Sequence, residues 1–535
     1  MKEYFLKKKK QISKFVDDKL CPKCKNELVV DADYKKCTRC NHNFVMTAKE
    51  RIELICDKDT FSSLNFQQDI ECVNNDFKKK IEYYQNKTQL DEAVIVGTAK
   101  ISGIEVALGV MDANFLCGTV GVVVGELIVK LIEYATLNRL PLLFFSASGG
   151  IRVQEGVKAL VQMAKISSAL EDFDKNNLLF ISYVTNPTMG GLNASLATIG
   201  DIIIAEEDCT IGFTGSRVIK DILHEELPEG FQSTDFNLSN GAIDLIVDRE
   251  NSKKVIYDIL RKFSNKSKLQ YIKHRKINKR NNVDVLDIYS SIRSGNHIRN
   301  KDIVDMLFNN KIFLHGDRIN NEDSAIECCL CDFNSITLMV IYTNRCNDLK
   351  SNINNNFGMI SPAGFRKVLK NLKLAEKFDI PVIFFVDSPG AFPGIHAECN
   401  CQSTIIAQTL KVLSSLKVPI LSFITGEANS GGALGLIVGD YLGMLEKSLL
   451  SVISPEAFSL IVFKEKKSLE EIVSIMEITP IQNLNNGLID EIVYGKKLDE
   501  IVKNMNKIIN NKILELTNID KETLVNERKK RIRNW

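Results

Sequence analysis

PVIFFVDSPG, Pro381–Gly390, is the most informative stretch for the architecture: it is a short apolar run that starts after a proline and ends in small or polar residues and a glycine turn. The same pattern occurs in the first half of the chain as PLLFFSASGG, Pro141–Gly150. Short apolar runs bounded by Pro and Gly are typical of strands buried on both faces of a parallel sheet. The two stretches therefore predict two copies of one α/β domain.

Two further matches follow these strands in the same order. Gly190 of TMGGLNAS follows Gly150 at nearly the same separation at which Gly431 of NSGGALGL follows Gly390. The third match pairs Ile199–Phe213 with Val438–Ser454. Chance recurrence of glycine pairs after apolar strands explains one match but not three in order, so we interpret the chain as an internal duplication.

The paired glycines are the candidate reactive feature. A Gly-Gly at a helix start leaves backbone N–H groups unpaired and lets a substrate oxygen come close to the chain, as an oxyanion hole requires. The alternative is that these glycines only permit tight turns and close packing, and for a single pair that would be preferred. Their recurrence favours the site, whose candidate residues are Gly149, Gly150, Gly190, Gly191, Gly390, Gly431 and Gly432.

A separate motif near the start of the chain predicts a metal site. CPKCKNELVVDADYKKCTRC has the spacing C-x2-C-x12-C-x2-C, which brings Cys21, Cys24, Cys37 and Cys40 together as a tetrahedral sulfur site for Zn2+. Four protein ligands leave no open position, so the metal is expected to be structural. The basic residues around it permit nucleic-acid contact, but no aromatic platform lies among them, and we expect a solvated surface instead.

Composition excludes several protein classes. The chain has 535 residues, 44% hydrophobic and 25% charged, with a formal charge of only +2, so a protein built to coat nucleic acid or an anionic membrane is not indicated. No apolar stretch reaches the length of a membrane span, and no signal-peptide core follows the basic start. We expect a cytoplasmic protein with reduced cysteines outside the zinc cluster.

The chain is expected to divide into five parts, with a boundary at a basic stretch. From Arg261 to Arg280 there are nine Lys or Arg and no acid, which is a poor pattern for a core element. The charged C-terminal end, KKRIRNW, is expected to be frayed. The predicted parts are an N-terminal segment with the zinc ribbon (1–50), an α/β domain (51–262), a basic linker (263–285), a second α/β domain (286–516) and a charged tail (517–535).

Several common catalytic motifs are missing from the sequence. It contains no G-x-S-x-G elbow, no G-x-x-x-x-G-K-[ST] loop, no G-x-G-x-x-G fingerprint and no H-E-x-x-H. The six histidines include His315 and His396 near recurring features, and a lone histidine more often packs than catalyses. These absences favour chemistry performed by backbone amides.

Taken together, the motifs resemble those of a known family. The first half, with CPKC, CTRC, FSASGGIRVQEG, NPTMGGLNAS and GFQSTDF, resembles the β subunit of bacterial acetyl-CoA carboxylase carboxyltransferase. The second half, with LHGDR, NFGM, AEKFDIPVIFFVDSPGAFPGI, SGGAL and VISPEAF, is similar to its α subunit. The resemblance covers residues 20–262 and 300–495, so the chain looks like a β-then-α fusion.

The resemblance implies two crotonase-like domains of repeated ββα units, with an active site between them, behind a small zinc ribbon. It implies transfer of a carboxyl group from carboxybiotin on a carrier protein to acetyl-CoA, giving malonyl-CoA for fatty acid synthesis. Gly149, Gly150, Gly190 and Gly191 match the family's positions beside the CoA thioester. Gly390, Gly431 and Gly432 match its positions beside the biotin urea oxygen.

The resemblance also implies partners, since the sequence has neither a biotin-attachment MKM nor a biotin carboxylase domain. The expected partners are a biotin carboxyl carrier protein and a biotin carboxylase, with self-association to a dimer or higher and no nucleic-acid or membrane partner. The alternatives are a carboxyltransferase or decarboxylase for another acyl-CoA, or a zinc-ribbon nucleic-acid-binding regulator. The chain departs from the family's pattern at Cys117, Phe392, Asn400, Cys401, Ala428 and Asn429.

Overall fold

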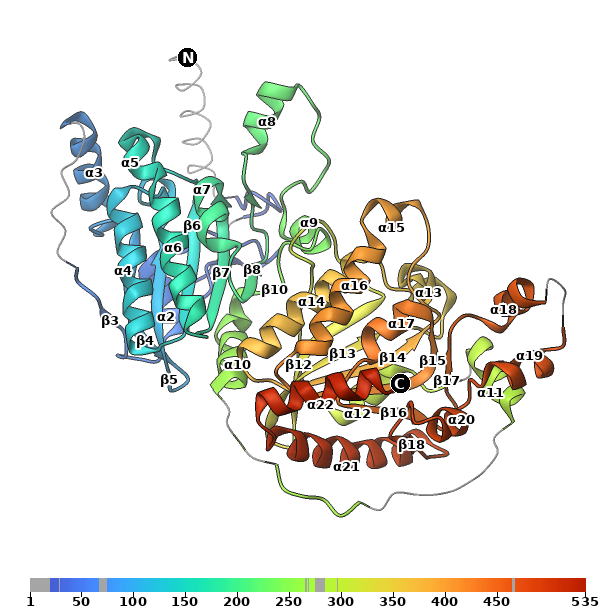
Figure 1. Ribbon diagram of the computed structural model, residues 1–535. Helices are drawn as coiled ribbons and strands as arrows, with labels where there is room; N and C mark the ends of the chain where they lie inside the picture. Colours follow the sequence, from blue (N-terminus) through green and yellow to red (C-terminus); the bar gives the residue numbers. More distant parts are fainter. Residues whose placement is uncertain are drawn as a thin grey trace. The chain divides into compact units, whose positions relative to one another are not determined.

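The computed structural model describes residues 20–27, 29–66, 75–264, 267, 269–274, 284–295, 297–463 and 467–535. The chain forms two compact units (Figure 1). Unit 1 comprises Met1–Asn237 and Leu245–Leu260, and unit 2 comprises Leu238–Asp244 and Arg261–Trp535. The five-part division predicted from the sequence stays a prediction, and within it residues 1–19 and much of the basic linker lie outside the described residues.

Unit 1 is built on a mixed sheet whose parallel part carries the first sequence repeat. The strand order is β10-β8-β7-β6-β5-β4-β3, with β9 paired to β7. Strands β3, β4 and β5 are antiparallel, and β5 through β10 along this path are parallel. The strands are β3 (Ser62–Ser63), β4 (Val94–Ile101), β5 (Ile104–Met111), β6 (Leu142–Ser148), β7 (Phe180–Met189), β8 (Ile202–Glu206), β9 (Ile211–Gly212) and β10 (Leu245–Val247).

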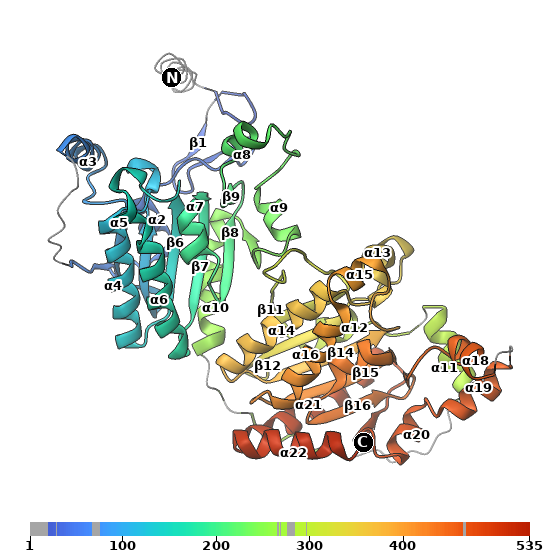
Figure 2. The same cartoon turned by 45° about the horizontal axis from the view of Figure 1, so that its top comes forward.

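Helices α4 and α6 pack against each other beside this sheet (Figure 2). Every residue of β6 is buried. This confirms the prediction that its continuous apolar run forms a strand covered on both faces. The helices of unit 1 are α2 (Ala48–Ile55), α3 (Asn75–Thr88), α4 (Val122–Asn138), α5 (Val157–Leu160), α6 (Gln162–Lys175), α7 (Gly190–Leu192), α8 (Ser216–Leu223), α9 (Thr234–Ser239) and α10 (Ser252–Ser264).

Unit 2 repeats this plan. Its sheet has the order β11-β12-β13-β14-β15-β16-β18, with β17 paired to β15, and only β11, β12 and β13 are antiparallel. The strands are β11 (Asn309–Phe313), β12 (Ile326–Phe333), β13 (Ile336–Thr343), β14 (Val382–Ser388), β15 (Ile420–Asn429), β16 (Tyr441–Leu445), β17 (Leu449–Ser451) and β18 (Glu491–Val493).

The helices of unit 2 pack in the same manner, with α14 against α16 and α16 against the C-terminal α22. They are α11 (Val285–Arg293), α12 (Asn300–Leu307), α13 (Leu349–Asn354), α14 (Pro362–Lys377), α15 (Ile395–Cys399), α16 (Gln402–Ser415), α17 (Ser430–Ile437), α18 (Pro455–Val462), α19 (Leu469–Met476), α20 (Pro480–Asn485), α21 (Leu498–Thr517) and α22 (Lys521–Arg533). None of the helices in the described part of the chain is both long and apolar enough to cross a membrane.

The structure confirms the duplication and corrects its register by one position. Strands β6 and β14 begin at Leu142 and Val382, and β7 and β15 begin at Phe180 and Ile420, so both pairs have the same offset. With that offset, the helix start at Gly190 corresponds to the one at Ser430. The predicted match of Gly431 with Gly190 was therefore wrong. The backbone is left-handed at both positions, with φ 61° at Gly190 and 63° at Ser430, so a serine here adopts a conformation that glycine favours.

The C-terminal end is a packed helix, so the expectation that it would be frayed was wrong. Arg528 of α22 is buried and donates hydrogen bonds to both carboxylate oxygens of Asp440, at 2.8 and 2.6 Å. The same guanidinium also donates to the backbone carbonyls of Leu413, Leu416 and Val418. The basic residues of the C-terminal end suggested a solvent-exposed segment. Arg528 instead satisfies carbonyls at the end of α16 that would otherwise lack partners.

Part of the predicted basic linker is also bound to unit 2. The backbone N–H of Ile272 donates to Asn511 Oδ1 at 2.9 Å, and Asn511 Nδ2 donates back to the Ile272 carbonyl at 2.6 Å. Asn510 of the same helix, α21, donates to the Gln270 carbonyl. This segment therefore lies along α21, and side-chain amides satisfy its backbone.

We predict that Arg528→Met destabilises unit 2, because it leaves the buried Asp440 carboxylate without its cation. Removing one partner of a buried ion pair costs about 3–5 kcal/mol. The measurement is the midpoint of denaturant-induced unfolding, with Lys530→Met as the control, since Lys530 is exposed on the same helix and carries the same charge. Equal midpoints for the two variants would contradict the assignment.

Candidate functional site

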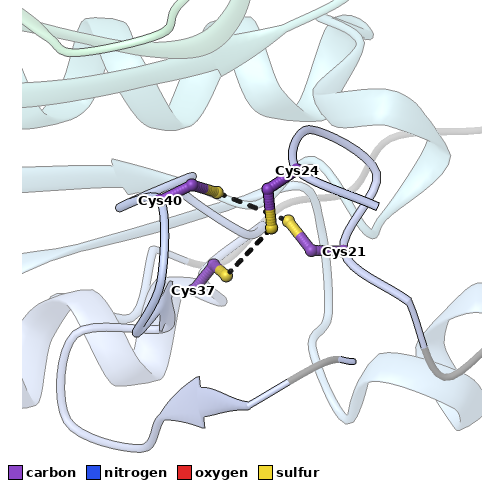
Figure 3. Close-up of side chains that lie close together, drawn as sticks. All are labelled: Cys21, Cys24, Cys37 and Cys40. Atoms are coloured by element: carbon purple, nitrogen blue, oxygen red, sulfur yellow. Dashed lines mark hydrogen bonds between the residues drawn. The ribbon is translucent and has the colours of Figure 1, made fainter. Parts of the chain in front are cut away.

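The four predicted metal ligands lie together in unit 1. Cys21 and Cys24 come from one turn, and Cys37 and Cys40 come from a second turn that follows β1 (Val30–Asp31) and β2 (Lys36–Cys37). The sulfur atoms lie within 4.8 Å of one another, with Cys21 and Cys40 at 3.6 Å and Cys24 and Cys37 at 4.0 Å (Figure 3). A tetrahedral ion with bonds of about 2.3 Å needs sulfur atoms about 3.8 Å apart. The cluster therefore has the dimensions of such a site.

The two turns have the same local structure. The N–H of Lys25 donates to the Cys21 carbonyl, and the N–H of Asn41 donates to the Cys37 carbonyl, both at 2.9 Å. Lys25 and Asn41 are both left-handed, at φ 58° and 56°. The backbone N–H of Asn26 lowers the pKa of the Cys24 thiol, whereas burial raises the pKa of the Cys40 thiol.

The basic residues of this module are largely paired within unit 1. Lys23 donates to both carboxylate oxygens of Asp208, Lys35 pairs with Glu50 at 3.0 Å, and Lys36 pairs with Glu250 at 3.4 Å. Such pairs contribute little stability, but they place an acid beside each base. Each of these three lysines therefore has a carboxylate partner within unit 1.

A buried cluster that sequence reasoning missed joins the cysteine module to the sheet. Glu206, the last residue of β8, accepts hydrogen bonds from Arg51 and Arg249, and all three side chains are buried. Arg249 also donates to the backbone carbonyls of Tyr34 and Phe44. Burial alone would raise the pKa of Glu206, but the two guanidinium groups lower it to about 2. The carboxylate therefore stays ionised and holds both arginines in place.

The predicted glycines of unit 1 lie together at the carboxyl ends of β6 and β7, the edge where parallel sheets bind ligands. A Cβ at Gly190 would come within 3.1 Å of the Gly150 Cα, and one at Gly150 would lie 3.7 Å from the Gly191 nitrogen. Three of the four amides already have acceptors. Gly149 donates to the Cys117 carbonyl, Gly150 to Ser148 Oγ and Gly190 to the Phe213 carbonyl, at 2.8, 3.0 and 3.1 Å.

Unit 2 brings its three predicted glycines together in the same way. A Cβ at Gly432 would come within 2.8 Å of the Gly390 carbonyl carbon, so the two turns touch. The Gly390 amide donates to Ser388 Oγ at 3.2 Å, as its counterpart Gly150 donates to Ser148. A Cβ at Gly431 would meet nothing within 4 Å, so this backbone faces open space.

The amides without acceptors are only partly those predicted. Within the described residues, the N–H groups of Gly191, Gly431 and Gly432 have no hydrogen-bond partner. The same holds for Ile151 and Ala391, which follow the strand-end glycines and which the sequence analysis did not include. The signal for them was their position directly after Gly150 and Gly390. Each unit thus presents one such amide after a strand and at least one at a helix start.

A second missed residue, Arg152, holds the first turn of unit 1. Its side chain is 1% exposed, and it donates to Glu92 at 2.6 and 2.7 Å and to Glu155 at 2.9 Å. It also donates to the Thr119 carbonyl at 3.0 Å. Because Arg152 comes directly after Ile151, this buried network fixes the backbone that carries the Ile151 amide. Arg152 belongs to the quoted motif FSASGGIRVQEG. Nothing in the residue spacing indicated that Glu92 and Glu155 would pair with it.

Two of the departures from the family's pattern are explained by backbone conformation. Cys117 and Cys401 are left-handed, at φ 57° and 59°, a conformation that glycine adopts more readily. This conformation costs a residue with a Cβ about 1 kcal/mol, which a glycine would not incur. Ala428 is fully buried in β15, and the half-buried Asn400 donates a side-chain hydrogen bond to the His396 carbonyl. Nothing in the structure explains the departure at Phe392.

Comparison with known families gives two matches that together extend to the end of the chain. Residues 44–302 match the carboxyl transferase domain, and residues 248–535 match the family described as acetyl co-enzyme A carboxylase carboxyltransferase-like. The overlap of the two matches, residues 248–302, contains the predicted linker. Neither match includes the four cysteines.

Curated relatives resemble the chain over most of its length. The acetyl-coenzyme A carboxylase carboxyl transferase subunits beta/alpha of Clostridium tetani are 39% identical over 92% of this chain and 88% of that protein. Those of Natranaerobius thermophilus are 36% identical over 90% of this chain and 86% of that protein. The names of both relatives join the beta and alpha subunits, as the sequence predicts here.

A solved structure confirms the predicted fold. The transcarboxylase 12S, described as a hexamer with methylmalonyl-coenzyme A bound, matches with a TM-score of 0.71 over 88% of this chain and 89% of that chain. Its sequence identity is 19%, so the likeness concerns the fold. The predicted pair of crotonase-like domains is the architecture observed.

We predict that alanine has opposite effects at the two adjacent glycines of α17. A Cβ at Gly432 would come within 2.3 Å of the Ala391 nitrogen, so Gly432→Ala must displace backbone and should lower stability by about 1–3 kcal/mol. Gly431→Ala meets open space and should leave the melting temperature unchanged or slightly raised. Thermal unfolding of the two variants distinguishes these outcomes, and a normal melting temperature for Gly432→Ala would contradict the close approach.

Proposed function

The chain belongs to the acetyl-CoA carboxylase carboxyl transferase family in its fused beta/alpha form, and on this premise we propose that it moves a carboxyl group from carboxybiotin to acetyl-CoA. The product is malonyl-CoA. The observation that carries the proposal is the pair of strand-end turns whose amides lack acceptors, repeated in both units. Amides of this kind stabilise negative charge that develops on an oxygen.

The proposed reaction balances without a side-chain base. The bond between the biotin N1 and the carboxyl carbon breaks, releasing CO2 and leaving the electron pair on the urea. The urea nitrogen takes a proton from the methyl group of acetyl-CoA, and the resulting enolate carbon forms a bond to CO2. Negative charge therefore develops first on the urea oxygen and then on the thioester oxygen.

The two turns are proposed to serve these two oxygens. In unit 1 the amides of Ile151 and Gly191 would hold the thioester oxygen, with Gly149, Gly150 and Gly190 shaping the turn. In unit 2 the amides of Ala391, Gly431 and Gly432 would hold the urea oxygen, with Gly390 shaping the turn. Removing one such donor typically costs about 3–4 kcal/mol of the barrier. The serines at the strand ends accept from the amides of Gly150 and Gly390, so these two amides are not among the proposed donors.

Zinc is the metal proposed for the four cysteines, because four thiolates at these separations suit a tetrahedral ion. The cysteines would hold it as a closed structural site, while the Glu206 cluster fixes the module against β8. The proposed partners are a biotin carboxyl carrier protein and a biotin carboxylase. We also propose a cytoplasmic location and self-association to at least a dimer.

The first test is malonyl-CoA decarboxylation that depends on free biotin, which is the reverse half-reaction. Gly431→Val should lower kcat/KM for biotin at least about tenfold, since the side chain would enter the space in front of the amides. Gly215→Val is the matched control, because a Cβ at Gly215 also meets open space but lies at the start of α8. A folded Gly431→Val protein with normal kinetics would contradict the assignment. Propionyl-CoA beside acetyl-CoA in the forward assay would test the acyl specificity.

The second test concerns the metal. The purified protein should contain about one zinc per chain, and Cys37→Ala should lose it, because a three-thiolate site binds more weakly. Cys56→Ala is the matched control, since Cys56 is a buried thiol outside the cluster. Mass spectrometric metal analysis measures both variants. Full zinc in Cys37→Ala would refute the ligand set.

A further inference from the structure

Asn429 is a helix-capping residue that does not cap its helix. It is the N-cap of α17 with an extended backbone, φ −116° and ψ 140°, the position at which asparagine is strongly preferred. Its side-chain oxygen would normally accept from the second or third helical amide, which here are those of Gly431 and Gly432. No such bond is present. Asn429 Nδ2 instead donates to Glu427 Oε2 at 2.8 Å.

The carboxylate that holds Asn429 is itself fixed. Glu427 is 2% exposed, and its other oxygen accepts from Arg345 Nη1 at 2.7 Å. Arg345 also reaches Asp387 Oδ1 at 3.3 Å, and the backbone N–H of Glu427 donates to that same oxygen at 3.1 Å. A bond to an ionised carboxylate is stronger than a neutral cap bond. Asn429 therefore remains with Glu427 and leaves the helix amides bare.

His297 and Arg299 lie beside the Asp387 carboxylate of this network. Asp387 is 1% exposed, and His297 Nε2 lies 2.7 Å from its second oxygen, with Arg299 at 3.5 Å. Burial alone would raise the pKa of Asp387, but the hydrogen bond and charge of His297 and the charge of Arg345 hold it well below its usual range. Arg345 thus lies between two buried carboxylates, those of Glu427 and Asp387.

In unit 1 the helix start also lacks a side-chain cap, but for a different reason. Met189, the last residue of β7, occupies the position that Asn429 has at the end of β15, and it too is an N-cap without a side-chain hydrogen bond. Methionine has no group that caps a helix, so the Gly191 amide needs no protection there. In unit 2 the residue at this place is a capping type, and the amides are bare only because Glu427 holds it away.

We propose that Glu427 is a positioning residue that withholds the Asn429 side chain from the first turn of α17 and thereby keeps the Gly431 and Gly432 amides open to a ligand's carbonyl oxygen. The identity of that oxygen, the biotin urea, rests on the function proposed above. The competition between cap and ligand is independent of it. Glu427 touches neither amide and acts only through Asn429.

The decisive comparison is Asn429→Asp against Asn429→Ala. An aspartate is repelled by Glu427 and attracted to the helix N-terminus, so it should cap α17, whereas alanine cannot cap. Residue-resolved hydrogen exchange should then show the Gly431 and Gly432 amides protected at least about fivefold more in Asn429→Asp than in Asn429→Ala. In the biotin-dependent decarboxylation of malonyl-CoA, the KM for free biotin should rise by a similar factor in the aspartate variant.

A rescue experiment separates positioning from a merely structural role of Glu427. Glu427→Leu should free Asn429 to cap, protecting the two amides and raising the KM for biotin while leaving that for malonyl-CoA unchanged. Glu427→Leu/Asn429→Ala should restore both readouts, since no capping group remains. A double variant as impaired as Glu427→Leu would overturn the proposal. If Glu427→Leu does not fold, the comparison at Asn429 decides the matter with Glu427 intact.

The outcomes also separate this proposal from the function. A wild-type protein without biotin-dependent decarboxylation would refute the proposed reaction, but the exchange comparison would still stand. Equal exchange at Gly431 and Gly432 in Asn429→Asp and Asn429→Ala would overturn the positioning role, whatever the activity.

Discussion

The parallel pairing of two strands in each unit is the constraint on which the rest of the site depends. Ser148 is aligned with Thr188 between β6 and β7, and Ser388 with Ala428 between β14 and β15. This alignment brings a turn at the end of one strand against a helix start at the end of the next. A shift of one strand by one position would move its end turn away from the neighbouring helix start, so the positions of the amides depend on this register.

The positions of the glycines alone could not predict which of these amides have acceptors and which do not. Glycine marks where the backbone comes close or turns left-handed, but it does not show which N–H group already has an acceptor. Ser148 and Ser388 occupy the amides of Gly150 and Gly390, and the donors without acceptors lie at the next position, at Ile151 and Ala391. The chemistry proposed for the site therefore depends on which N–H groups lack acceptors as much as on residue type.

The sequence predicted the larger features because each rests on a local signal. The four cysteines, the apolar strands and the duplication follow from spacing and periodicity, and all three are present. The features that were missed depend on side chains distant in sequence, such as Arg152 with Glu92, and Glu206 with Arg51 and Arg249. The register error at Ser430 has another origin: the glycine pairs were matched by residue type, but the first helical residue in unit 2 is a serine with the same left-handed backbone.

The two units have the same uncapped helix start after the second strand, with different side chains at the cap position. The function proposed here uses a helix start without a side-chain cap after the second strand in both units, and in unit 1 the residue at the cap position is an apolar methionine. In unit 2 the cap position is an asparagine bonded to the buried Glu427, whose other oxygen accepts from Arg345, since a buried carboxylate needs a nearby cation. A single polar residue at the cap thus accounts for a chain of buried charges reaching Asp387 and His297. Where the cap residue cannot hydrogen-bond, no such chain is required.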